Sequence, residues 1–355
     1  MDLCGTRFAE NCSQKIVEYK ELKVMNQNSN LTRAPILVIA FNRAESTRKV
    51  LEALILSNVN EVYFAVDGPR IGVIEDLARV SEVTSLVDEF KGRLKFKTLI
   101  RDTNLGCRLA VTDAITWFLS QEIFGIILED DCVPSEEFLT FASRMLTIYQ
   151  DQENIMHVGG SSYLRQGVDY PYNHYFSSFH EVWGWATWAR AWKFFQLDPG
   201  LHTIEEDELI LNHFKSKKIA NWFMGYLIQV RAENPSVWST QWSLSIIKNK
   251  GIAVNPIGNL VKNIGFSPDS THGSDKSFRY YDTFSLTKLP SLPDPTILEI
   301  NFNLDKKRFK VIQKTDPSLF IKNILKAKIR KLVLAYFPKK IILLIRKFKS
   351  TLKRK

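Results

Sequence analysis

Residues 36–41 read ILVIAF, an apolar run that is long enough for one strand and too short for a helix. Such a run is typical of a strand that is buried on both faces of a parallel sheet. Comparable short segments follow at 62–66, 96–100 and 125–128, and the segment 62–66 ends in the turn sequence Asp67-Gly68-Pro69. Each is followed by a segment whose apolar residues have helical spacing, and these predicted helices cover residues 44–56, 74–90, 107–120 and 135–149.

Strand and helix therefore alternate four times within about 115 residues. This pattern predicts an α/β fold with a mostly parallel, doubly wound central sheet. Ligands bind to such sheets at the carboxyl ends of the strands. The residues of interest are those that follow each strand, namely 42–43, 67–68, 102–104 and 129–131.

Three adjacent carboxylates, Glu129, Asp130 and Asp131, follow the fourth predicted strand directly. Like charges this close repel one another unless a cation neutralises them. Carboxylate oxygens favour Mg²⁺ or Mn²⁺, and such a metal could bridge a diphosphate and stabilise a leaving group. The alternative is a solvated acidic turn before the next helix, where acidic residues favour the helix N-terminus.

The other strand ends carry side chains suited to a nucleotide. Asp67 could accept hydrogen bonds from a base or ribose, and Arg43 offers a fork of donors to a base or phosphate. Asn104 and Arg108 lie at a predicted helix start, where amide groups and a cation favour an anion. The alternatives are an ordinary turn aspartate, a surface arginine and a helix cap.

Residues 183–188 read WGWATW, which is an unusual concentration of tryptophan. Indole rings pack well against sugar faces while the N–H donates a hydrogen bond. Trp183 and Trp185 flank a glycine and are predicted to contact a sugar or the acceptor. The alternative is a tryptophan-rich core, and it is given equal weight for Trp188 and Trp192.

Several of these segments together resemble one family, the GT-A-fold glycosyltransferases related to N-acetylglucosaminyltransferase I and to bacterial surface-polysaccharide enzymes. The resemblance covers roughly residues 34–273 and keeps the family's order. It implies a Rossmann-like GT-A fold. The segments that carry it are 35–43, 67–69, 104–106, 128–134, 183–188 and 263–272.

The resemblance implies roles for five of these residues. Arg43 and Asp67 would hold the nucleotide base. Glu129 and Asp130 would face the nucleoside, and Asp131 would be the direct metal ligand, for Mn²⁺ or Mg²⁺. The donor would be a nucleotide-diphosphate sugar, with UDP favoured as the nucleotide.

Two positions late in the chain, 239 and 272, bear on the general base and on the diphosphate or metal. His272 corresponds to a residue that relatives bring to the diphosphate or the metal, but it also suits a surface loop. Relatives often carry an aspartate general base where this chain has Ser239, and a serine cannot act as a base without a partner. Glu181 and Asp269 are the nearest motif-linked carboxylates and become the candidate bases. The family leans toward inversion of configuration.

The net charge of +10 is unevenly distributed. Residues 317–355 hold 13 Lys or Arg and no Asp or Glu, so the other 316 residues carry 10 − 13 = −3. This distribution argues against a specific nucleic-acid-binding domain, which would carry its charge on a folded face. The segment has the pattern of two basic amphipathic helices broken at Pro338, and such helices bind anionic membrane surfaces. A solvated basic tail is the alternative.

The expected organisation is a polar leader over 1–33, a GT-A domain over 34–275, a linker over 276–316 and the membrane-associating tail over 317–355. No signal peptide and no apolar run of spanning length is apparent. A cytoplasmic location, peripheral on the inner face of the cell membrane, is therefore expected. The cysteines lack metal-ligand spacing, and Cys107 and Cys132 are expected to be small buried residues.

The function predicted from these observations is metal-dependent transfer of a sugar to a glycan or lipid-linked saccharide in bacterial surface-polysaccharide synthesis. Two alternatives stay open. One is a sugar-nucleotide nucleotidyltransferase, although the loop at 42–48 lacks the glycines that a triphosphate would need. The other is a non-enzymatic membrane-binding protein on a decayed transferase fold, which the serine at 239 keeps open.

Overall fold

The computed structural model describes residues 33–164, 168–198, 200, 203–233, 237–265 and 284–315, with a few more between 321 and 329. The chain divides into two compact units. The first comprises residues 1–200 and 236–311, and the second comprises 201–235 and 312–355. The predicted leader and the predicted basic tail lie almost entirely outside the described residues.

The alternation expected from the sequence is present, and every predicted strand and helix of the first half begins within one or two residues of its expected start. Helix α5 (Glu136–Ile148) begins after Ser135, whose hydroxyl accepts a hydrogen bond from the Phe138 amide at 3.1 Å. The elements are β1 (Ile36–Ala40), α2 (Ala44–Leu56), β2 (Glu61–Val66), α3 (Ile74–Phe90), β3 (Lys95–Ile100), α4 (Cys107–Leu119), β4 (Phe124–Glu129) and α5 (Glu136–Ile148).

These strands belong to an eight-stranded sheet with the order β3-β2-β1-β4-β8-β6-β9-β7. Strands β1 to β4 are mutually parallel, and β6 pairs in parallel with β9. Strand β8 is antiparallel to β4 and β6, and β7 is antiparallel to β9. The protein is thus a mixed α/β protein with a large, mostly parallel sheet. The later strands are β6 (Ile155–Gly159), β7 (His174–Ser177), β8 (Trp185–Trp188) and β9 (Ile252–Pro256).

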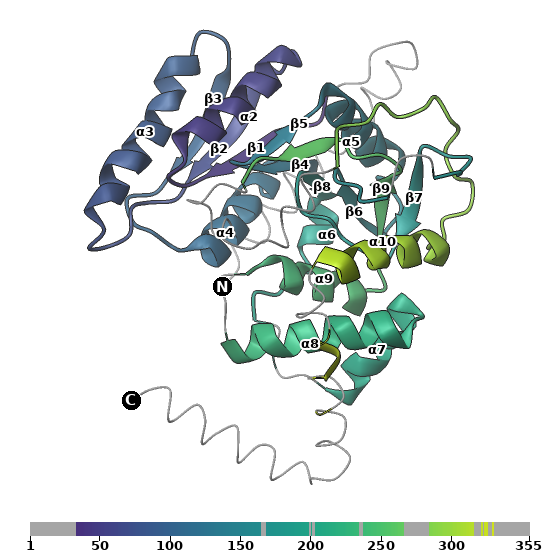
Figure 1. The fold of residues 1–355 in the computed structure, drawn as a ribbon. Coiled ribbons are helices and arrows are strands. Elements are labelled where there is room, and N and C mark those ends of the chain that lie inside the picture. The colour runs from purple at the N-terminus through teal and green to yellow at the C-terminus, as the bar shows by residue number, and fades with distance from the viewer. Residues whose placement is uncertain are drawn as a thin grey trace, which may run out of the picture. The chain divides into compact units, whose positions relative to one another are not determined.

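Strand order reverses between β1 and β4, and this reversal positions the site. From β1 the chain adds β2 and β3 on one side and then returns to add β4 on the other. Right-handed crossovers then place α2 and α3 on one face of the sheet and α4 on the opposite face (Figure 1). A crevice forms at the carboxyl end of such a switch point, because the neighbouring connections diverge.

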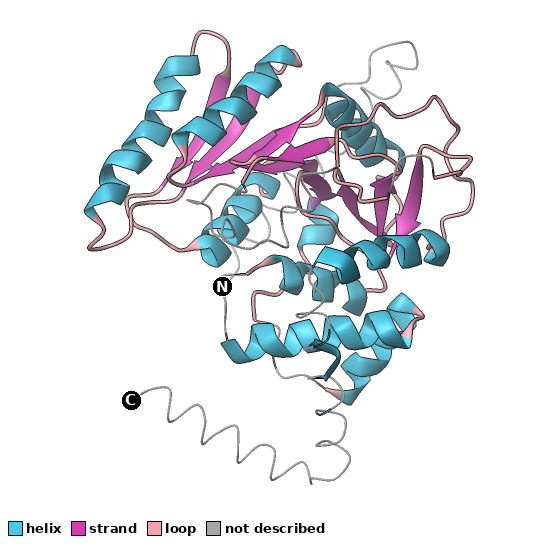
Figure 2. Ribbon diagram, viewed as in Figure 1, coloured by secondary structure: helices cyan, strands magenta, loops and turns pink. Residues whose placement is uncertain are grey.

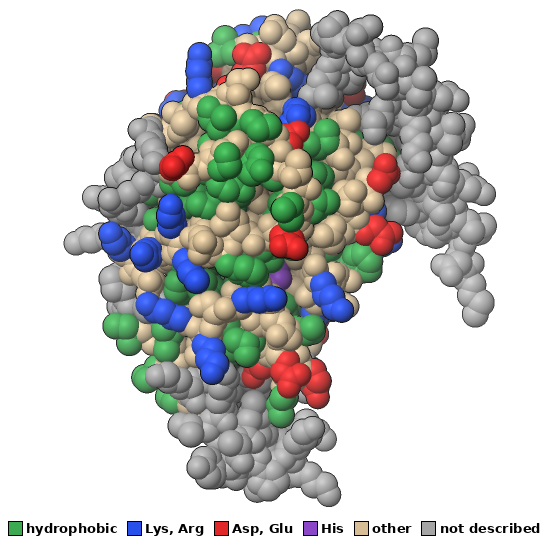
Figure 3. Space-filling view, turned by 90° about the vertical axis from the view of Figure 1, so that its right-hand side faces the viewer, with side chains coloured by type: hydrophobic (Ala, Val, Ile, Leu, Met, Phe, Trp, Pro, Cys, Tyr) green, Lys and Arg blue, Asp and Glu red, His purple; other side chains and the backbone are tan. Residues whose placement is uncertain are grey.

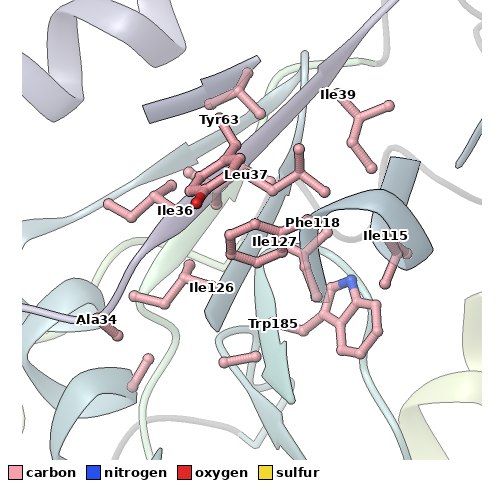
Figure 4. Packing of buried hydrophobic residues seen from close by; sticks show 14 of the residues in the cluster. Ala34, Ile36, Leu37, Ile39, Tyr63, Ile115, Phe118, Ile126, Ile127 and Trp185 are labelled. Carbon is pink, nitrogen blue, oxygen red and sulfur yellow. The ribbon is translucent and has the colours of Figure 1, made fainter. Parts of the chain in front are cut away.

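The core surrounds the central strands, and every residue of β1 is buried. Figure 4 shows Leu37, Phe118 and Ile127 packed together beneath Tyr63, with Trp185 beside them. Helices or loops cover both faces of the central strands (Figure 2), which explains their continuous apolar runs. The edge strand β3 contains no buried residue, so the expectation of burial on both faces does not hold for residues 96–100.

A small two-stranded sheet lies next to the end of β4. Strands β5 (Cys132–Pro134) and β10 (Val261–Asn263) pair antiparallel, which brings residues more than a hundred positions apart beside the carboxylate turn. Three further helices complete the first unit's described elements, namely α6 (Ala189–Trp192), α9 (Ser239–Lys248) and α10 (Phe302–Thr315), whose last residues belong to the second unit.

The second unit contains two helices that pack against each other, α7 (Ile204–Phe214) and α8 (Lys217–Glu233). Lys215, with φ 47°, turns the chain between them. The buried Glu206 accepts two hydrogen bonds from Arg231, at 2.7 and 3.0 Å, which ties the helices together. No helix within the described part of the chain has the length and apolarity needed to cross a membrane.

The cysteine prediction is half wrong. Cys132 is buried, as expected, whereas Cys107 is exposed at the first position of α4. The spacing of apolar residues in 107–119 places positions 110, 111, 114 and 115 toward the core, and position 107 falls outside that stripe.

Candidate active site

The candidate site lies at the switch point between β1 and β4. Ile39 of β1 pairs with Glu129 of β4, so the two strands end side by side. Arg43 comes three residues after β1, and Asp130 and Asp131 form the turn from β4 into β5. The fold therefore brings the predicted arginine and the predicted carboxylates together.

Arg43 pairs with two of the three carboxylates. Its Nε donates to Asp130 Oδ2 at 3.2 Å, and its Nη2 donates both to Asp130 Oδ1 and, at 2.9 Å, to Asp131 Oδ2. The Asp130 side chain is only 5% exposed, compared with 15% for Asp131 and 27% for Arg43. The guanidinium thus forms a two-point contact with a buried carboxylate and a single contact with a more accessible one.

Glu129 has a different environment from its neighbours. Burial, followed by the charges of Asp131 and Asp130, raises the pKa of Glu129 to about 8, and Arg43 offsets only part of this. Burial likewise raises the pKa of Asp130, while the charge of Arg43 opposes the shift. A cation bound beside this turn would be stabilised by the same carboxylates whose repulsion raises these pKa values.

Asp67 holds the loop that precedes α4. Its Oδ1 accepts from the amides of Gly68 and Leu105, and its Oδ2 accepts from the Gly106 amide and from Asn104 Nδ2, at 2.8 to 3.1 Å. A carboxylate has about four acceptor positions, so protein donors fill them here. The structure thus shows Asp67 and Asn104 as partners of each other, and their predicted contact with a nucleotide stays a prediction.

Close backbone approach explains the glycine that follows Asp67. A Cβ at Gly68 would lie 2.4 Å from the backbone nitrogen of Thr103, which real structures do not tolerate. The loops after β2 and β3 therefore pack against each other, and the Asp67 hydrogen bonds fix their register. Arg108, also predicted for donor binding, lies in the first turn of α4 and is half-buried.

Asp76 is a polar group at this edge that the sequence did not single out. It is 1% exposed and accepts from Asn42 Nδ2 at 2.9 Å and from the Arg70 guanidinium at 2.5 and 2.9 Å. The hydrogen bonds from Arg70 outweigh burial and lower the pKa of the Asp76 carboxyl below its usual range. The Arg70 guanidinium also lies 5.5 Å from the centroid of the Phe41 ring. Asp76 therefore orients two side chains beside the end of β1.

The carboxylate turn has the chemistry to bind a divalent cation through Asp131. Among the described residues, the donor to Asp131 Oδ1 is the Cys132 thiol at 3.4 Å, which is a weak donor. A Cβ at Gly265 would lie 2.1 Å from Oδ2 of Asp131, so a larger residue there would displace the Asp131 carboxylate. Within the described ranges, no three His, Cys, Asp or Glu side chains are grouped to hold a metal. One or two carboxylates with phosphate oxygens commonly suffice for Mg²⁺.

The two predicted sugar-contacting tryptophans differ in position. Trp183 is partly buried, with its ring 5.8 Å from that of Tyr163, so it can contact a ligand. Trp185 is completely buried in β8, stacked on His157 and Trp238, and its predicted role is wrong. The physical reason is that β8 lies between β4 and β6 in the sheet, where both faces are covered.

The candidate bases can be placed only in part. Glu181 lies in the loop before β8 and accepts from Arg308 Nε of α10 at 2.5 Å. Asp269 and His272 lie outside the described residues. Ser239 is the first residue of α9 and follows Trp238, whose ring packs on Trp185.

A groove of about 410 Å³ lies beside the start of β7. It is at the same edge of the sheet as the carboxyl end of β4, but on the other half of the sheet. Strand β7 begins beside the end of β9, which runs in the direction of β4, so Tyr172 lies at the same edge as Glu129. Figure 3 faces the side on which β7 and α10 lie, where hydrophobic side chains gather. The sequence did not indicate this groove, because its residues belong to none of the motifs. Its lining includes Tyr170, Tyr172, Glu299, Asn301, Phe302 and Asn303.

Comparisons with known proteins identify no family. No protein-family model matches the chain, and no curated protein matches it. Among solved structures, the chain matches a mannosyltransferase from Pyrobaculum calidifontis, described in complex with GDP-mannose and Mn²⁺. The match has 12% sequence identity and a TM-score of 0.40, and it covers 98% of this chain and 90% of the other.

Proposed function

We propose that the protein is a metal-dependent glycosyltransferase that moves a sugar from a nucleotide-diphosphate sugar to a glycan or lipid-linked saccharide. The observation that carries this proposal is the convergence of Arg43 with Asp130 and Asp131 at the β1–β4 switch point. Switch points of this kind hold ligands, and a carboxylate turn beside an arginine suits a metal-bound diphosphate. The ordered resemblance of the surrounding sequence to GT-A enzymes supports the same function.

Each residue of the site has a task in this proposal. Asp131 would hold the metal, which when bound would neutralise charge on the departing diphosphate. Arg43 can donate to a phosphate or base, and the Asp67-bound loop at 104–106 fixes the start of α4 beside it. A carboxylate, either Glu181 or Asp269, would take the proton from the acceptor hydroxyl, with inversion at the anomeric carbon.

The acceptor would lie toward the second half of the sheet. Trp183 is one contact, and the groove beside β7 is a second that suits a sugar, because it combines tyrosine rings with carboxamide and carboxylate groups. The groove is four strands from β4, which corresponds to about 19 Å at the usual strand spacing. An acceptor of several sugar units could span that distance.

The biological setting belongs to the proposal as well. A role in bacterial surface-polysaccharide synthesis, on the inner face of the membrane, fits the basic residues of 317–355. Sedimentation with anionic liposomes tests this setting. The full chain should sediment and a truncation after residue 315 should not, and equal sedimentation of both would exclude the tail as the anchor.

A donor screen tests the activity. The protein would be incubated with UDP-, GDP- and dTDP-sugars in the presence of Mn²⁺, and release of the nucleoside diphosphate would be measured with and without added oligosaccharides. We expect release from one nucleotide class, stimulated by an acceptor and abolished by chelation. Release of pyrophosphate from a nucleoside triphosphate and a sugar phosphate would instead favour a nucleotidyltransferase.

A further inference from the structure

Arg43 forms different numbers of hydrogen bonds with the two aspartates of the carboxylate turn, Asp130 and Asp131. Two of its three hydrogen bonds go to Asp130, which is buried, and one goes to Asp131, which is more exposed. The single contact engages Oδ2 of Asp131, whose side chain is more exposed than that of Asp130. A guanidinium keeps its charge at any physiological pH, so this contact cannot be relieved by loss of a proton.

We propose that Arg43 is an internal counter-cation that competes with the divalent metal for Asp131. It leaves Asp131, while staying on Asp130, when metal and nucleoside diphosphate bind together. The identity of the ligand rests on the proposed function, but the competition itself concerns only this chain and the metal.

The geometry allows such an exchange at low cost. A metal at Asp131 would place two positive charges beside a guanidinium that shares the same carboxylate, and the repulsion weakens binding of the metal alone. The two contacts with Asp130 let the guanidinium turn away without leaving a buried carboxylate unpaired. The Nη2 N–H freed from Asp131 can then donate to a phosphate oxygen, in a charge-assisted hydrogen bond.

The consequence is coupling between the two ligands. The diphosphate compensates both cations, so each ligand should bind more tightly in the presence of the other, and by the same factor. An arginine that merely contacts the nucleotide would not affect the metal when no nucleotide is present. The affinity for metal alone therefore separates the two roles.

The test measures Mn²⁺ binding without nucleotide, by the electron paramagnetic resonance signal of the free ion. Arg43→Met should bind Mn²⁺ about tenfold more tightly than wild type, within the usual range of coupling between sites. Because Arg43→Met leaves Asp130 unpaired, the comparison is repeated in a background without that charge. Asp130→Asn and the double variant Arg43→Met/Asp130→Asn should differ in the same direction.

Arg48→Met is the matched control. Arg48 lies on the same helix, α2, and pairs with Glu89 away from the turn, so its loss removes one positive charge without freeing Asp131. It should leave Mn²⁺ affinity within about twofold of wild type, since exposed charges are screened. An equal gain in Arg48→Met would mean a general charge effect and would overturn the proposal.

The proposal is also overturned if removal of Arg43 leaves Mn²⁺ affinity unchanged or weakens it in both backgrounds. Its failure differs from failure of the proposed function. If Arg43→Met does not tighten Mn²⁺ binding but wild type still releases a nucleoside diphosphate from a donor, only the competition is wrong. If Mn²⁺ binding tightens and no donor is turned over, the competition holds and the transferase function fails.

Discussion

Strands β4 and β8 lie side by side in the sheet, and each carries a motif that stands out in the sequence. The carboxylates at 129–131 come at the end of β4 and in the turn that follows, where they meet Arg43 at the switch point. The last four residues of the tryptophan motif form β8 (Trp185–Trp188), so Trp185 pairs with Ile127 and is fully buried. An unusual residue points to a ligand site when it follows a strand, and to the core when it lies within one.

The largest expected effect is a loss of activity on changing a carboxylate that follows β4. Asp131→Asn removes the carboxylate proposed to hold the metal, and nucleotide-sugar turnover should fall by about 10³-fold, because metal stabilisation of a leaving group is worth several kcal/mol. Steady-state kinetics measure the loss, and thermal unfolding should be little changed. Glu136→Gln, an exposed acidic residue at the start of α5, is the control that should retain activity. Normal turnover in Asp131→Asn would refute the metal role.

The next effect concerns β8. Trp185→Ala should lower the free energy of unfolding by about 3–5 kcal/mol, since it leaves a large cavity between the helices and the sheet. Trp183→Ala should cost far less, because its ring is only partly buried. Chemical denaturation of both variants gives the comparison. Equal losses would mean that the two tryptophans do not differ in burial as described.

Asp67→Asn tests whether this residue organises the loop before α4. The new amide nitrogen would face the donors of Asn104 and Gly106, so we expect a loss of about 2 kcal/mol in stability. Hydrogen exchange of the Leu105 and Gly106 amides should accelerate. Asp102→Asn, an exposed change in the same loop, should do neither, and an unaffected loop in Asp67→Asn would contradict the assignment.

A pH effect is expected from His157, a residue of β6 whose ring stacks on Trp185 of the neighbouring strand β8. Burial lowers the pKa of His157 to about 3, although the Glu181 carbonyl opposes this slightly. Below pH 6.5 the unfolded chain therefore takes up a proton that the folded chain does not. Stability present at pH 7 should be lost as the pH falls, by up to about 1.4 kcal/mol per unit between pH 6.5 and 3. His157→Gln should flatten this part of the wild-type stability profile, and an identical slope would exclude the effect.

The smallest effect concerns the groove beside β7. Once an acceptor has been found, Tyr172→Ala should raise its KM about fivefold, the loss expected for one ring contact. Donor hydrolysis without acceptor should not change, because the groove is four strands from β4. An unchanged KM for every acceptor longer than a disaccharide would exclude the groove.

The first half of the fold was predictable because apolar runs of strand length alternate there with helical spacing. Residues 36–66 show how completely this local pattern determines β1, α2 and β2. The carboxylate turn and Arg43 could be predicted for the same reason, since both follow strands. The pairing of β8 between β4 and β6 could not, because antiparallel insertion depends on contacts distant in sequence, and the burial of Trp185 follows from it.

Other features were missed because single residues carry no local pattern. Asp76 looks like an ordinary acidic residue in the first turn of α3, and only the fold places Arg70 and Asn42 around it. The acceptor positions of the Asp67 carboxylate are likewise filled in part by two backbone amides nearly forty positions away in the sequence. The groove combines segments around residues 170 and 300, which a β-bridge between Phe176 and Ile300 and a hydrogen bond from the Asn301 amide to the Phe176 carbonyl bring together.

The central claim is that metal and nucleotide bind together at the β1–β4 switch point. Thermal unfolding of the purified protein with UDP, GDP or dTDP, each with and without Mn²⁺, tests it most directly. We predict that one nucleotide raises the unfolding temperature, that the rise requires Mn²⁺, and that Asp131→Asn abolishes it. No rise with any nucleotide, or the same rise in Asp131→Asn, would contradict the claim.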